Sequence, residues 1–249
     1  MHRRTVTSLA IGGLVLLAGA DLASGRGTSP AQAPAPVGLA ATPPVLTFTK
    51  PTTLAGRVPG VAAGTFVGLQ ADTWPYGDGY AQVRATTTAP DGSFSFSFLP
   101  SIGTRFHVVA GHASAPLLSP DVLVQVRARI GLTLARPSRR AGNRVRFFCH
   151  VSPPHDGKTV SIQREGAGGR WVTVARTKLT HDAARPTRSN YSIVLAVRRS
   201  GRYRARIGAS LGNLAGHSAR RRITVFGTTV KLPPRGAAAV SAGRSGSCG

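Results

Sequence analysis

The fold of this chain is decided by a short alternating stretch, Ser93-Phe94-Ser95-Phe96-Ser97-Phe98. Because successive side chains of a β-strand point to opposite faces, this order places the phenylalanines on one face and the serines on the other. The stretch follows Pro90-Asp91-Gly92, which predicts a tight turn, since glycine tolerates a positive φ and aspartate hydrogen-bonds its own backbone. These residues therefore predict a β-strand with one face in an apolar core.

The same kind of pattern returns in the second half of the chain. The counterpart of the phenylalanine strand is Tyr191-Ser192-Ile193-Val194-Leu195-Ala196-Val197. Other segments pair in the same order: 46–51 with 132–137, 67–70 with 160–163, and 104–106 with 201–203. No stretch beyond the N-terminal apolar run keeps a helical period, so the sequence predicts an all-β protein of two tandem β-sandwiches.

The order of segments in the second half also resembles a known family. It runs Val160-Ser161-Ile162-Gln163, Gly169-Arg170-Trp171-Val172-Thr173-Val174-Ala175, Tyr191-Ser192-Ile193, Gly201-Arg202-Tyr203-Arg204-Ala205, and then residues 218–225. This order resembles the immunoglobulin-like repeats of secreted actinobacterial proteins, over residues 44–226 and better in the second half. The resemblance implies accessory β-sandwiches that space, present or attach other parts of extracellular proteins. The first half departs from the pattern at Tyr80, which stands in place of tryptophan after an insertion at 74–79.

The N-terminal segment predicts export. Met1-His2-Arg3-Arg4 is a basic start, and an apolar run over 9–18 leads to the small residues Ala18-Gly19-Ala20. We therefore expect a signal peptide over 1–20, with an uncleaved N-terminal anchor as the alternative, and a secreted protein that is extracellular or associated with the cell wall. Residues 21–43 read as a Pro/Ala-rich linker, 44–128 as the first sandwich, 129–226 as the second, and 227–249 as a disordered basic tail.

Two cysteines in an exported chain, Cys149 and Cys248, suggest a disulfide, worth ~4–5 kcal/mol for a loop of this length. Alternation argues against it. In Val145-Arg146-Phe147-Phe148-Cys149-His150-Val151 the odd-numbered residues share one face, so Cys149 points into the core. We expect Cys149 to be a buried free thiol and Cys248 to be available for an intermolecular disulfide.

Positive charge is concentrated in the second half. Residues 44–128 carry five Lys or Arg against four Asp, whereas residues 129–226 carry 21 against three acidic residues. Alternation in Arg202-Tyr203-Arg204-Ala205-Arg206-Ile207 and in Arg220-Arg221-Arg222-Ile223-Thr224-Val225 puts arginines on the side away from the core. Because the last two strands of such a sandwich pair with each other, we expect one outer face to carry Arg202, Arg204, Arg206, Arg220 and Arg222.

Like charges that face each other across strands destabilise a sheet unless an anion or solvent relieves them. We therefore expect this face to bind a polyanion, since guanidinium groups make bidentate contacts with phosphate and carboxylate. The expected partners are anionic cell-wall polymers, acidic polysaccharides or an anionic lipid surface, and export argues against a gene-regulatory role on nucleic acid. A solvated basic surface that only aids solubility is the simpler alternative.

A second candidate surface is aromatic. Trp74, Tyr76 and Tyr80 crowd a glycine-rich turn of the first half, where they could stack on sugar rings or on apolar groups of a protein. The alternative function is therefore an adhesion module for carbohydrate or protein ligands, and the alternative structural role is that Tyr80 belongs to the core.

Motifs for enzymatic chemistry are not found. The sequence has no Gly-x-Ser-x-Gly elbow, phosphate-binding loop or zinc-protease helix, and its single glutamate is Glu165. His150, His155 and Asp156 lie around a Ser-Pro-Pro turn without further ligands at zinc spacing. The His-Ser pairs at 112–114 and 217–218 read as parts of hairpin loops. We expect a protein that is not an enzyme and that needs no cofactor or metal.

Overall fold

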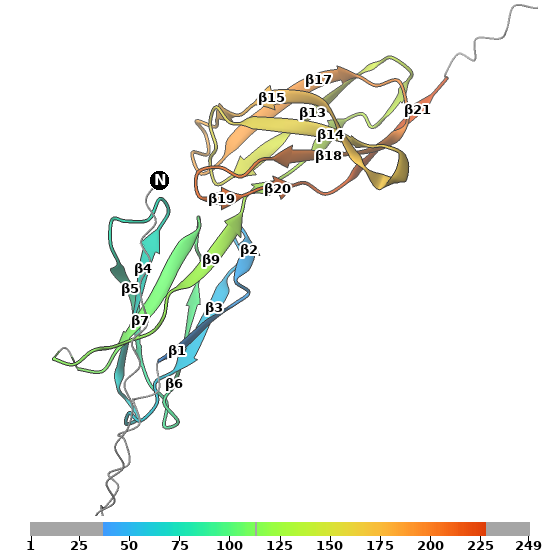
Figure 1. The fold of residues 1–249 in the computed structure, drawn as a ribbon. Coiled ribbons are helices and arrows are strands. Elements are labelled where there is room, and N and C mark those ends of the chain that lie inside the picture. The colour runs from blue at the N-terminus through green and yellow to red at the C-terminus, as the bar shows by residue number, and fades with distance from the viewer. Residues whose placement is uncertain (1–36, 113, 228–249) are drawn as a thin grey trace, which may run out of the picture. The chain divides into compact units, whose positions relative to one another are not determined.

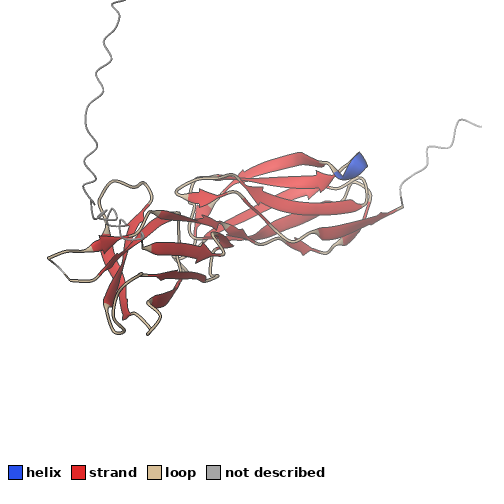
Figure 2. Cartoon of the chain, turned by 60° about the horizontal axis from the view of Figure 1, so that its bottom comes forward, coloured by secondary structure: helices blue, strands red, loops and turns tan. Residues whose placement is uncertain are grey.

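The computed structural model of the protein describes residues 37–112 and 114–227. The expected signal peptide, most of the expected linker, the basic tail and Cys248 lie outside these residues. Within them the chain is built of β-strands and loops, with one turn of 3-10 helix at Ala167–Gly169 (Figures 1 and 2). No helix in the described ranges has the length and hydropathy needed to cross a membrane.

The first sandwich consists of two mainly antiparallel sheets. One has the order β1-β3-β6 and the other the order β9-β7-β4-β5, with β2 pairing in parallel with β9 and the short β8 pairing with β7. The strands are β1 (Gly38–Thr42), β2 (Val45–Thr47), β3 (Thr52–Arg57), β4 (Phe66–Thr73), β5 (Ala81–Thr87), β6 (Ser93–Phe98), β7 (Thr104–Ala110), β8 (Leu117–Leu118) and β9 (Val122–Arg127).

The second sandwich repeats this arrangement. One sheet has the order β10-β13-β17-β16, with β11 also on β13, and the other has the order β12-β21-β18-β14-β15, with β12 parallel to β21. The strands of this half of the chain are β10 (Arg129–Ile130), β11 (Thr133–Ala135), β12 (Ser138–Arg140), β13 (Arg144–Ser152), β14 (Thr159–Glu165), β15 (Trp171–Lys178), β16 (Thr180–His181), β17 (Ser189–Ala196), β18 (Gly201–Ile207), β19 (Asn213–Leu214), β20 (Gly216–His217) and β21 (Arg221–Phe226). Of these, β19 pairs in parallel with β9 and belongs to its sheet. Two such sheets packed face to face are the immunoglobulin-like sandwich, so the predicted fold class is confirmed.

Each sandwich has its own apolar core. Leu54, Leu69 and Phe106 are fully buried in the first, and Phe147 and Ile162 in the second. Strand β1 lies in the range expected to be linker, whereas Cys149 of β13 faces the core as expected.

The first core begins earlier than expected. Val37 is 2% exposed and β1 occupies 38–42, within the range that we expected to be linker. The Pro/Ala-rich composition is misleading here, because small residues allow β1 to lie close against β3. Gly56 of β3 shows the fit: a Cβ atom at that position would overlap the backbone carbonyl of Gly38.

Cys149 lies on the core side of β13, as the alternation predicts. It is a free thiol, partly buried and packed against the second core. Its cross-strand partner is Tyr191, just as Gly56 pairs with Phe94 in the first sandwich. The Cys149 sulfur fits because Gly131 lies opposite, where a Cβ atom would overlap it.

The two sandwiches correspond residue by residue on the sheet that carries the candidate site. The pairing register shifts between Leu69 and Gln70, where β5 has the extra residue Val83, and between Ile162 and Gln163, where β15 has the extra residue Val174. Gln70 pairs with His107 of β7, and Gln163 pairs with Arg204 of β18. The internal repeat seen in the sequence is therefore a repeat of strand register.

Candidate functional site: a basic sheet face

Strand β18 carries the centre of the candidate site. Its burial alternates, with Tyr203, Ala205 and Ile207 in the core and Arg202 and Arg206 exposed on the outer face. Arg204 is on the same outer side but half-buried. The predicted alternation of this strand is confirmed.

Neighbouring strands add further arginines to the same outer face. Arg222 of β21 lies directly across from Arg202. On the other side of β18, Arg206 pairs with Ser161 of β14, and Ser161 pairs in turn with Arg176 of β15. Arg176 was not among the predicted residues. Its alignment with Arg206 depends on the register in which β14 pairs with β15, and no local sequence pattern reveals that register.

Arg220 reaches the face from outside a strand, since β21 begins at Arg221. The Ser218 hydroxyl positions it: Oγ accepts a hydrogen bond from the Ala205 amide and donates one to the Ala219 carbonyl, both at 2.9 Å. We call the six residues Arg176, Arg202, Arg204, Arg206, Arg220 and Arg222 the basic face.

An indole ring lies within the basic face. The Arg204 guanidinium carbon is 4.2 Å from the centroid of the Trp171 ring, and that of Arg220 is 5.7 Å away. Arg204 also donates through Nε to Oε1 of Gln163 at 2.9 Å. Partial burial lowers the pKa of Arg204, and the nearby charges of Arg206 and Arg220 lower it further. Trp171 therefore aligns two guanidinium groups that repel each other.

One carboxylate lies next to the basic face. Glu165 Oε2 is 3.5 Å from Nη1 of Arg202, a distance at which a solvent-exposed pair contributes little. The described residues contain no other ion pair to these six arginines. Five guanidinium groups are thus available to an external anion without breaking an internal ion pair.

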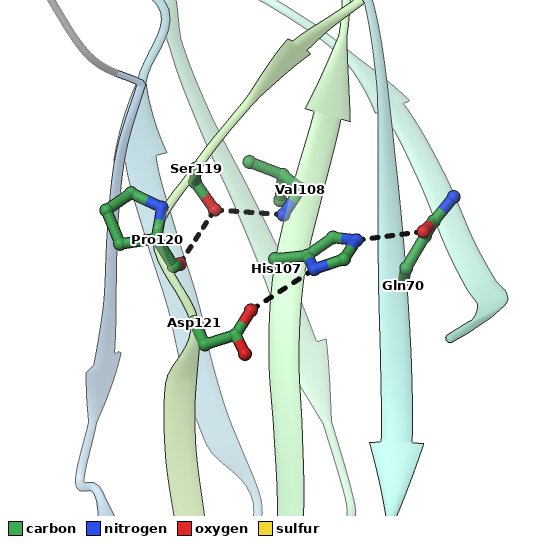
Figure 3. A network of polar contacts seen from close by, with 6 residues as sticks. All are labelled: Gln70, His107, Val108, Ser119, Pro120 and Asp121. Atoms are coloured by element: carbon green, nitrogen blue, oxygen red, sulfur yellow. Dashed lines mark hydrogen bonds and ion pairs between the residues drawn. The ribbon is translucent and has the colours of Figure 1, made fainter. Parts of the chain in front are cut away.

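The first sandwich has the opposite charge at the equivalent place (Figure 3). His107 interacts through Nε2 with Oε1 of Gln70 at 2.9 Å and through Nδ1 with Oδ1 of Asp121 at 3.3 Å. Ser119 accepts from the Val108 amide at 3.0 Å and donates to the Pro120 carbonyl at 3.0 Å. Asp121 therefore corresponds to Arg220, because each lies two residues after the same serine.

Trp74 and Tyr76 line one hollow, and Tyr76 and Tyr80 pack on polar side chains of β7. The Tyr80 ring stacks on His107 with centroids 3.9 Å apart, and burial raises the pKa of Tyr80 to about 12. The Tyr76 ring lies beneath the Arg105 guanidinium, 4.3 Å from its carbon. Trp74 is 41% exposed and contacts Gly212. Tyr76 and Tyr80 thus cover polar residues of β7, and Trp74 is the most exposed of the three.

Of the histidines and serines that could suggest catalysis or metal binding, Ser218 and His155 have structural partners. Ser218 is buried and makes the hydrogen bonds described above, while His217 is exposed. His155 is fully buried, with Nδ1 2.7 Å from the Pro153 carbonyl and Nε2 3.3 Å from that of Ser210. Among residues 37–112 and 114–227 no three His, Cys, Asp or Glu side chains are grouped as metal ligands.

These sheets define the chain as a tandem immunoglobulin-like β-sandwich protein. No family model and no curated protein matches it. Similar solved structures include a tandem repeat from the extending region of a large adhesion protein, with 16% identity over 70% of this chain and 46% of that one (TM-score 0.35). The D0–D1 domains of intimin give 13% identity over 76% and 99% (TM-score 0.28), and a chimeric titin Z1Z2 tandem gives 17% over 74% and 94% (TM-score 0.26). The chain spans less than half the length of the first of these. At these TM-scores the likeness is one of strand arrangement only.

Proposed function

We propose that this protein is a non-enzymatic module of the cell exterior that binds anionic polymers through the basic face of its second sandwich. The observation that carries the proposal is the grouping of Arg176, Arg202, Arg204, Arg206, Arg220 and Arg222 on one outer sheet face beside a single carboxylate. The partners that fit are wall polymers, acidic polysaccharides and anionic lipid surfaces.

Electrostatics favours a polymeric ligand over a single small anion. Side chains on one face of a strand are about 6–7 Å apart, and directly opposed residues on paired strands are about 5 Å apart. Both spacings are shorter than the Debye length of about 8 Å at physiological salt, so neighbouring guanidinium groups repel one another despite screening. A chain with repeated anionic groups relieves several of these repulsions at once and releases the counterions that otherwise do so.

The test uses long-chain inorganic polyphosphate as the probe, with neutral dextran for comparison. Replacing Trp74 with Phe leaves Trp171 as the only tryptophan, so its fluorescence reports directly on the basic face. We expect polyphosphate to change Trp171 emission with an affinity that falls steeply between low and moderate salt. Arg202/Arg204/Arg206→Ala should weaken binding at least ten-fold and reduce the salt slope by roughly three. Because Arg204 covers the indole, the affinity of this variant is measured by sedimentation with labelled polyphosphate.

The matched control removes the same charge elsewhere. Arg144/Arg146/Arg185→Ala alters the sheet of β13 and β17 and the loop before β17, away from the basic face. If this control loses as much affinity as the basic-face variant, the chain acts only through its net charge and the proposal is wrong.

The aromatic alternative predicts the opposite salt response. Binding by stacking on Trp74 should tolerate salt and should include neutral dextran or another neutral ligand. The packing of Tyr76 on Arg105 and of Tyr80 on His107 favours the basic face as the better candidate.

A further inference from the structure

A hollow of about 250 Å³ lies in the second sandwich, away from the basic face. Its residues come from β14, β15, β17, β18 and the turn that joins β17 to β18. Its lining is part apolar and part basic. We call Val174, Leu195, Val197 and Tyr203 the wall, and Arg164, Arg198 and Arg199 the rim.

Two differences between the sandwiches account for the hollow. The register aligns Leu195, which pairs with Val145, with Phe98, which pairs with Thr52. Phe98 packs edge-on against Phe106 of the first core, with ring centroids 5.0 Å apart. A leucine has no ring to fill the equivalent space.

The second difference is an inward-facing arginine. Arg164 pairs with the buried Tyr203, as the buried Ala71 pairs with Phe106 in the first sandwich. Arg164 is therefore on the core side of β14, half-buried at the end of the core. A charged group in such a position is costly unless it has a partner of opposite charge.

None of the three rim guanidinium groups has such a partner within the described part of the chain. Arg164, Arg198 and Arg199 make no side-chain hydrogen bond and no ion pair there. An apolar wall beneath three free cations matches a ligand with one anionic group and a compact apolar part.

We propose that this hollow binds a short anionic amphiphile, a carboxylate or phosphate monoester on a short apolar chain. The anion would contact the rim arginines, and the chain would lie against Val174 and Leu195, which are more exposed than Val197 and Tyr203. A volume of about 250 Å³ corresponds to roughly eight water-sized groups at ~30 Å³ each, which suits a short chain rather than a full lipid tail.

Isothermal titration of the full chain with octanoate and with octyl phosphate tests the proposal. We expect both to saturate one site, and acetate and octyl glucoside to bind at least ten-fold more weakly, because each lacks one half of the ligand. Leu195→Phe, which copies the first sandwich, should reduce octanoate affinity at least ten-fold, whereas the volume-conserving Leu195→Ile should retain it. Arg164/Arg198/Arg199→Gln should reduce it similarly.

Further measurements separate this site from the basic face. Arg202/Arg204/Arg206→Ala should bind octanoate like the parent chain, and Leu195→Phe should bind polyphosphate like the parent chain. An unchanged thermal midpoint shows that Leu195→Phe is folded. Equal octanoate affinity in Leu195→Phe, or equal affinity for acetate and octanoate, overturns the proposal. Anionic phospholipid vesicles that compete as strongly as octanoate would assign the hollow to membrane lipid and overturn the short-chain ligand.

Discussion

At the scale of single residues, the two sandwiches differ most sharply at Asp121 and Arg220. Both follow a serine whose hydroxyl bridges the neighbouring strand and the next carbonyl. In the first sandwich the aspartate interacts with His107, whereas in the second the arginine shares the face of Trp171 with Arg204. The exchange of Asp121 for Arg220, together with that of His107 for Arg204, thus replaces an aspartate–histidine contact with two cations.

Reversing this substitution should reverse its effect. Arg220→Asp places a carboxylate within reach of Arg204, so the loss of polyphosphate affinity should be about ten-fold, larger than the loss in Arg220→Ala. Sedimentation with labelled polyphosphate measures both variants. Arg185→Asp changes the net charge equally and serves as the control. Equal losses in Arg220→Ala and Arg220→Asp would show that the pairing with Arg204 has no effect.

At the scale of strands, each sandwich needs a small residue where its first strand meets the neighbouring strand, and the two sandwiches place that residue on different strands. The first sandwich has Gly56 on the inner strand, and the second has Cys149 there and Gly131 opposite. The small residue is on the inner strand in the first sandwich and opposite it in the second.

This exchange predicts a specific rescue. Gly131→Ala should lower the free energy of unfolding by ~1–3 kcal/mol, since its methyl group overlaps the Cys149 sulfur. Adding Cys149→Ala should recover part of the loss. Urea unfolding of the four chains of the double-mutant cycle measures the coupling. Gly56→Ala should be worse than Gly131→Ala, because its methyl group meets a backbone carbonyl that cannot rotate away.

The loop that leads into β17 depends on two aspartates. The Ser189 hydroxyl, followed by His181, lowers the pKa of Asp156, and the Arg188 guanidinium lowers that of Asp182. A lowered pKa in the folded state means that the stabilisation is complete above the ordinary aspartate value of about 3.9 and is lost as the pH falls through the lowered value.

Asp182→Asn should therefore lower the thermal midpoint of the second sandwich at pH 7 but not in strong acid. The difference from the parent chain should shrink as the pH drops below about 4. Thermal scans of both chains at each pH measure this difference, with Asp78→Asn as a control in the first sandwich. A difference that is the same at every pH would contradict the assignment of Asp182 to an ionic contact.

At the scale of the whole molecule, charge and core are distributed differently. Each sandwich has its own apolar core, but nearly all the excess positive charge lies in the second. Self-repulsion should therefore destabilise the second sandwich and leave the first nearly unaffected.

Multivalent anions should reveal this imbalance. At equal ionic strength, phosphate should raise the unfolding midpoint of the second sandwich above its value in chloride by a few degrees, which corresponds to roughly 1 kcal/mol, and leave the first unchanged. Trp171 in a Trp74→Phe chain reports on the second sandwich, and calorimetry of the same chain follows the unfolding of both sandwiches. Equal shifts in both sandwiches would indicate a general salt effect.

Alternation along single strands and the pairing of the last two strands could be predicted from the sequence, whereas the pairing that brings Arg176 and Trp171 to the same face could not. Arg202, Arg204, Arg206 and Cys149 lie on the expected faces because a period of two needs only local information. Trp171 joins the basic face through a strand pairing whose register shifts at Gln163, which no composition reveals. The small residues of β1 predict a spacer by composition, although their smallness is what lets the strand pack.

The serine bridge shared by the two sandwiches has a consequence for how such a chain can evolve. The hydroxyls of Ser119 and Ser218 hold the backbone course before the last strand, whatever side chain follows two residues later. A single codon change at that position can therefore alter the surface while the backbone course is kept. Duplication followed by drift at such positions would allow one copy to acquire a new ligand while the other preserves the ancestral surface.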